Sequence, residues 1–60
     1  MRYAVEVYEE PHGGELVVTV RLHDHAAAQT VAVELHERHP HALVRLLRDG
    51  RLCQTWHGEE

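Results

Sequence analysis

Histidine is the residue type in this chain that could most readily bind a metal or respond to pH, because seven of the sixty residues are histidines. Imidazole is a common zinc ligand, and its charge changes near neutral pH. The candidate metal ligands are His36, His39 and His41, at the predicted end of a helix. His23 and His25 lie at the other end, about 20 Å away at 1.5 Å per residue, so one copy cannot combine both groups in one site. We therefore expect no metal or other cofactor, and a histidine-based metal- or pH-responsive module remains an alternative.

The other reactive side chains do not form a catalytic arrangement. The sequence contains no serine, which excludes a Ser-His-Asp triad. Cys53 and His57 lie four residues apart on one predicted strand, about 13 Å and too far for a hydrogen bond. We therefore expect a protein that is not an enzyme.

Alternating apolar and polar residues predict the strands that position these side chains. Residues 2–9 and 15–23 alternate with a period of two, which is typical of strands with one buried face. The segment between them, Glu10-Pro11-His12-Gly13-Gly14, has the composition of a turn. Residues 42–48 and 51–57 form a second predicted hairpin, because Asp49-Gly50 is a strong two-residue turn signal.

A single helix is predicted between the hairpins, over residues 25–38. Asp24 is suited to cap its first turn, and Pro40 cannot continue it. The last residues, Gly58-Glu59-Glu60, are expected to form a frayed tail. Residues 1–60 are thus predicted to form one α+β domain of order ββαββ, with a four-stranded, mostly antiparallel sheet and one helix packed on one face.

One helix cannot cover both faces of such a sheet, so the open face is the predicted protein interface. Alternation places under the helix Tyr3, Val5, Val7, Leu16, Val18, Val20, Leu22, Val44, Leu46, Leu52 and Trp56. The predicted interface on the open face consists of Tyr8, Val17, Thr19, Arg21, Leu43, Arg45 and Leu47. Contiguous exposed apolar surface typically marks a contact with another protein. Because so short a chain buries only a small core, we also expect a homodimer.

The charge of the chain bears on the kind of partner. A formal net charge of −4 opposes binding to phosphate backbones, so we do not expect a nucleic-acid partner. The alternative is a nucleic-acid-binding module that depends on the second hairpin. Its residues Arg45, Arg48, Arg51 and Trp56 would bind RNA or single-stranded DNA by phosphate contacts and base stacking. The chain has no long apolar run and no secretory signal, and its single cysteine fits a reducing compartment. We therefore expect a cytoplasmic protein that does not enter membranes.

Together these features favour a small non-catalytic protein-interaction module, whose protein partner the sequence does not identify. By analogy of class, a short acidic chain suits an inhibitor or regulator of a larger nucleic-acid-handling enzyme, of the kind that phages and mobile elements use. The opening Met1-Arg2-Tyr3, with Glu9 and Gly13-Gly14, resembles the first hairpin of HicB-type antitoxins. That family has a third strand before its helix, which this chain lacks. The resemblance therefore transfers no residue role and no activity.

Overall fold

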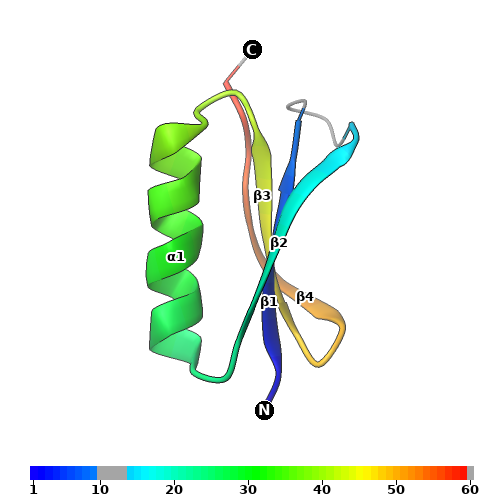
Figure 1. The fold of residues 1–60 in the computed structure, drawn as a ribbon, viewed down its shortest axis with the longest axis vertical. Helices are drawn as coiled ribbons and strands as arrows, with labels where there is room; N and C mark the ends of the chain where they lie inside the picture. The colour runs from blue at the N-terminus through cyan, green and yellow to red at the C-terminus, as the bar shows by residue number, and fades with distance from the viewer. Residues whose placement is uncertain (10–13, 60) are drawn as a thin grey trace.

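Four strands and one helix make up the fold of the described residues, in the predicted order ββαββ. The computed structural model describes residues 1–9 and 14–59. Its elements are β1 (Tyr3–Tyr8), β2 (Leu16–Leu22), α1 (His25–Arg38), β3 (Leu43–Arg48) and β4 (Arg51–Trp56). The strands form one antiparallel sheet in the order β2-β1-β3-β4, with the helix on one face (Figure 1). The α+β fold is therefore confirmed, while most of the predicted turn at residues 10–14 lies outside the described residues.

The second hairpin is closed by the two residues that the sequence indicates. Asp49 and Gly50 have φ values of 50° and 81°, and Arg48 pairs with Arg51 across them. Two consecutive residues with positive φ are the requirement of a type I′ turn, whose twist matches that of the flanking strands. Asp49 also accepts a hydrogen bond from the Arg2 amide at 3.0 Å through its Oδ1 atom, which ties this hairpin to the start of β1.

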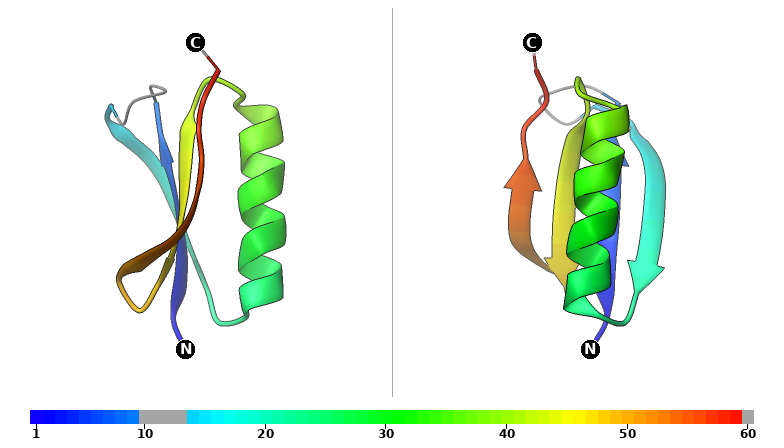
Figure 2. Two further views of the ribbon diagram at one scale, coloured as in Figure 1. Left: turned by 180° about the vertical axis from the view of Figure 1, so that it is seen from behind. Right: turned by 90° about the vertical axis from the view of Figure 1, so that its left-hand side faces the viewer.

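The core lies between the helix and the two central strands. Ala28 and Ala32 are completely buried, and their small side chains let the helix lie close to the sheet. The buried core consists of Tyr3, Val5, Val7, Ala28, Ala32, Ala42, Val44 and Leu46. At its edges pack the half-buried side chains of Leu22, Val31, Leu35 and Trp56. Seen from the helix side, α1 stands in front of the central strands, with β2 and β4 on either side of it (Figure 2, right).

The helix begins at a side-chain cap. Asp24 has an extended backbone, and its Oδ2 atom accepts a hydrogen bond from the Ala27 amide at 2.9 Å. Such a cap satisfies one of the free amides of the first turn. We expect Asp24→Ala to lower the free energy of unfolding by about 1 kcal/mol, whereas Asp24→Ser retains the cap. Urea denaturation followed by circular dichroism measures the difference, and equal midpoints for the two variants would contradict it.

Two β-bulges change which residues share a face. Val7 pairs with Val18 but Tyr8 pairs with Leu16, so Val17 is an extra residue on β2. Similarly, Leu46 pairs with Gln54 but Leu47 pairs with Leu52, so Cys53 is an extra residue on β4. An extra residue reverses the alternation beyond it, because side chains alternate with a period of two.

Three face assignments from the sequence are therefore wrong. Leu16 and Leu52 were expected under the helix, but each pairs with a residue of the open face. Val17 was expected on the open face, but it lines a groove on the helix side together with Val7 and Leu35. The other helix-facing residues keep their expected side, and Trp56 pairs with the buried Val44.

The C-terminal segment is docked, and the prediction of a frayed tail is wrong for Gly58 and Glu59. The Glu59 amide donates a hydrogen bond to the Pro40 carbonyl at 2.8 Å. The His41 ring donates through Nδ1 to the Glu59 carbonyl at 2.9 Å. His36 donates through Nε2 to the His57 carbonyl, also at 2.9 Å. These bonds hold the tail against the end of the helix and the turn that follows it.

Candidate functional site

The open face of the sheet has a layered pattern, which the strand register defines. Three rows of side chains cross the strands. The first row is Leu16, Tyr8 and Leu43; the second is Thr19, Glu6, Arg45 and Thr55; the third is Arg21, Ala4, Leu47 and Leu52. A polar middle row is thus flanked by a largely apolar row on one side, and on the other by a row that ends in two leucines.

The polar centre of the open face is held in place by its own contacts. Tyr8 donates a hydrogen bond from its hydroxyl to Glu6 Oε1 at 2.9 Å. This bond raises the pKa of the Tyr8 phenol, with smaller contributions from burial and from the negative charge of Glu6. The phenol therefore remains a protonated donor at neutral pH. Arg45 lies opposite Glu6 on the neighbouring strand, with its guanidinium carbon 5.9 Å from the centre of the Tyr8 ring.

Such an arrangement is suited to protein recognition. Tyrosine and arginine are enriched among the residues that contribute most to binding at protein interfaces. Side chains that are ordered before binding lose less conformational entropy when a partner arrives. The contacts among Tyr8, Glu6 and Arg45 provide this preorganisation.

A hollow of about 640 Å³ lies near the third row. Ala4 is among the residues that line it, together with Leu47 and Arg21. Because the side chain of Ala4 is a single methyl group, it leaves space between its longer neighbours. The third row therefore combines apolar surface with a depression between its side chains.

The structure brings together most of the predicted interface. Six of the seven predicted residues lie on the open face, and Val17 does not. Leu16 and Leu52 complete the apolar rows, and sequence alternation misplaced both because each strand contains a bulge. Glu6 was not among the predicted interface residues, although its place two positions before Tyr8 puts it on the same face.

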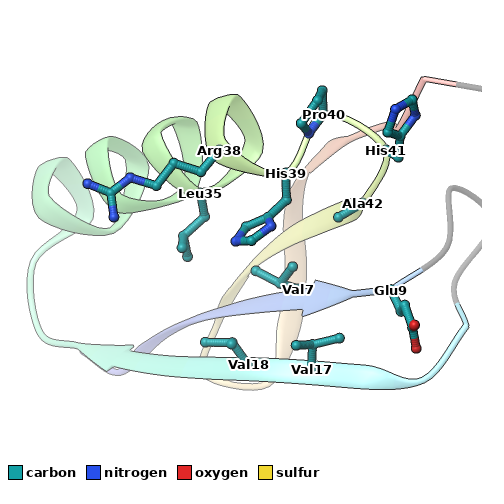
Figure 3. A pocket seen from close by; sticks show the side chains of 10 residues that line it. All are labelled: Val7, Glu9, Val17, Val18, Leu35, Arg38, His39, Pro40, His41 and Ala42. Atoms are coloured by element: carbon teal, nitrogen blue, oxygen red, sulfur yellow. The ribbon is translucent and has the colours of Figure 1, made fainter.

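A second partly apolar surface lies on the helix side, between β2 and the end of α1. It is a groove of about 500 Å³, lined by Val7, Glu9, Val17, Val18, Leu35, Arg38, His39, Pro40, His41 and Ala42 (Figure 3). Val17 and Val18 are 58% and 37% exposed there. They are exposed because the helix lies over the central strands and leaves this part of β2 uncovered (Figure 2).

The three histidines that are candidate metal ligands have other contacts. The rings of His36 and His41 each donate a hydrogen bond to a carbonyl of the C-terminal tail, whereas His39 lines the groove. Within residues 1–9 and 14–59, no group of three or more His, Cys, Asp or Glu side chains is arranged to hold a metal ion. His12 lies outside the described residues.

The four residues of the nucleic-acid-binding alternative are divided between surfaces. Arg48 and Arg51 pair at the tip of the second hairpin. Arg45 lies on the open face, whereas Trp56 lies on the helix side and packs against the core. The structure therefore brings Arg48 and Arg51 together, but does not combine Arg45 and Trp56 in one strand-binding surface.

Three observations about the whole molecule bear on the site. In the part of the chain that the structure describes, no helix is both long and apolar enough to cross a membrane. Cys53 is a free and exposed thiol. Comparison with known proteins found no matching family model, and no curated protein or solved structure with significant similarity to this chain.

Proposed function

We propose that this chain is a non-catalytic protein-binding module that contacts its partner through the open face of its sheet. The observation that carries the proposal is the ordered group of Tyr8, Glu6 and Arg45, which lies among the exposed or half-buried leucines of the first and third rows. A solvated face does not require leucines at these positions, and apolar side chains gathered on an exposed surface typically mark an interaction site. The proposal includes a cytoplasmic location, where an exposed thiol such as Cys53 stays reduced.

The acidity of the chain supports a more specific form of the proposal, in which the partner is basic. The net charge of −4 favours association with a positively charged surface, such as the groove of a nucleic-acid-handling enzyme. The chain would then act as an inhibitor or regulator by occupying that groove. In this form of the proposal, binding weakens markedly as salt increases, since screening reduces long-range attraction between charges.

The open face is tested by affinity capture with matched variants. Wild-type chain immobilised on beads is expected to retain a partner from lysate of its host cell at a constant ratio to the bait. Leu47→Glu places a charge in the third row of the open face and is expected to abolish retention. Val33→Glu is the control, because Val33 is 39% exposed on the helix and remote from that face.

Circular dichroism establishes that both variants fold. The proposal fails if Leu47→Glu retains the same partner as well as the wild type does. It also fails if the wild-type chain retains no protein in a constant ratio. Repeating the capture at low and high salt tests the basic partner separately, and retention that does not depend on salt contradicts that more specific form.

A further inference from the structure

The edge of the sheet at β2 has an unusual composition for an exposed edge. β2 pairs with β1 on one side, and among residues 1–9 and 14–59 no strand lies on its other side. Its sequence, Leu-Val-Val-Thr-Val-Arg-Leu, contains one charged residue and no proline or lysine. Proteins usually protect exposed edges with charged residues, especially lysine, or with proline, because an unpaired apolar strand is a template for another strand. The bulge at Val17 and the charge of Arg21 give β2 some protection, but the run from Val18 to Leu22 pairs regularly with β1.

The other edge of the sheet is better protected. β4 begins with Arg51, beside Arg48, and continues with the polar residues Gln54 and Thr55. Its bulge at Cys53 falls near the middle of the strand, which leaves no long regular run. The two edges therefore differ in their capacity to accept a further strand, and β2 is the more suitable.

The charges at the two ends of β2 are opposite. Glu15 precedes the strand, and Glu9 is tied to it by a hydrogen bond from the Glu9 amide to the Glu15 carbonyl at 2.9 Å. Arg21 lies near the other end, followed by His23. All four side chains are exposed. β2 thus has an acidic first end and, at Arg21, a basic second end, with an apolar run between them; the Asp24 carboxylate that follows His23 is engaged in the helix cap.

We propose that two copies of this chain associate through their β2 edges in antiparallel orientation, forming one continuous sheet across the dimer. Antiparallel pairing brings the acidic end of each strand beside the basic end of the other, whereas parallel pairing would place like charges together. With the twofold axis near Thr19, Val18 lies opposite Val20 of the other copy. Both residues face the helix side, since they pair with Val7 and Val5. The partner strand then covers the exposed side chain of Val18.

The symmetry of this contact limits the assembly to two copies. A twofold contact uses the same strand of both copies and therefore closes on itself. Pairing of β2 with β4 of another copy would instead leave one free edge of each kind and would propagate into fibres. The open face is not consumed by the β2 contact, so the dimer presents two open faces on one side of the extended sheet.

Light scattering during size-exclusion chromatography tests the dimer and the strand that forms it. The wild-type chain is expected to have the mass of two copies at high concentration and to dissociate on dilution. Val17→Lys, which adds a charge to the β2 edge, is expected to give a monomer. Leu52→Lys is the matched control on the β4 edge, with similar exposure of 51% against 58%, and is expected to remain dimeric.

Charge exchange tests the antiparallel orientation. E15R puts arginine at both positions 15 and 21, and R21E puts glutamate at both, so each variant alone brings like charges together at two symmetric places and is expected to raise the dissociation constant several-fold, up to about tenfold. An equimolar mixture of the two variants restores opposite charges at both ends. It is therefore expected to form a heterodimer with nearly wild-type affinity. The heterodimer is identified by a pull-down in which one variant carries an affinity tag and the other is detected with it.

Three results would overturn the inference. The first is a wild-type chain that remains monomeric at the highest concentration reached. The second is a dimer that Val17→Lys leaves intact, and loss of that dimer in Leu47→Glu would then assign self-association to the open face. The third is an equimolar mixture of E15R and R21E that does not associate. None of these results decides whether the open face binds another protein, because the capture experiment tests that separately.

Discussion

Truncation of Leu46 to alanine is expected to remove a large part of the stability of this protein. Leu46 is completely buried between the helix and the sheet, and it has one of the largest fully buried side chains. Buried Leu→Ala substitutions cost about 2–5 kcal/mol, because they lose burial and leave a cavity. At the usual stability per residue, a chain of sixty residues has about 3–9 kcal/mol in total. The variant should therefore be partly or wholly unfolded at room temperature.

Urea denaturation followed by the circular dichroism of the helix measures this loss. Leu52→Ala is the control, because Leu52 has the same side chain but is about half exposed on the edge strand β4. Its free energy of unfolding should remain within about 0.5 kcal/mol of that of the wild type. If both variants unfolded at the same urea concentration, Leu46 would not be the centre of the core.

Local signals in the sequence predicted the elements well. Asp24 and Pro40 mark a helix that extends from His25 to Arg38, as expected. Asp49-Gly50 marks the turn between β3 and β4. These signals act within a few residues, through a cap, a missing amide and a positive φ, and therefore depend little on the rest of the chain.

The composition of each face was harder to predict. Two bulges, at Val17 and Cys53, shift the register and exchange the faces of their neighbours Leu16 and Leu52. Neither bulge contains a glycine or another residue that would mark it in the sequence. A bulge is defined by how a strand pairs with its neighbour, so alternation along a single strand does not reveal it.

The docked tail depended on contacts between distant residues. The hydrogen bonds of His36 with His57, and of His41 with Glu59, join residues that are 21 and 18 positions apart. In the sequence, His36 and His41 were candidate metal ligands although no metal was expected, and Gly58-Glu59-Glu60 was expected to fray. The fold brings them together instead, because β4 returns alongside β3 toward the end of the helix.

Replacement of Gly58 by alanine is expected to detach this tail. A Cβ atom at Gly58 would overlap the His41 carbonyl oxygen and would lie 2.6 Å from its carbonyl carbon. Both atoms belong to the backbone, which cannot move aside as a flexible side chain can. The tail must therefore shift, and the hydrogen bonds made by Glu59 with Pro40 and His41 are lost. At about 0.5–1.5 kcal/mol for each hydrogen bond, the free energy of unfolding should fall by about 1–3 kcal/mol.

Gly50 supplies a control that separates lack of space from backbone conformation. It has a φ of +81°, but a Cβ atom there would meet nothing within 4 Å. Gly50→Ala should therefore cost about 1–2 kcal/mol through the left-handed conformation alone, and Gly50→Asn should recover much of it, because asparagine tolerates that conformation.

At Gly58 the asparagine variant should be no better than the alanine variant, since both add a Cβ atom. Hydrogen exchange at the Glu59 amide gives a direct measure of docking, and its protection should disappear in both Gly58 variants and persist in both Gly50 variants. Protection that survives in Gly58→Ala would show that the tail is not held by close backbone contact at His41.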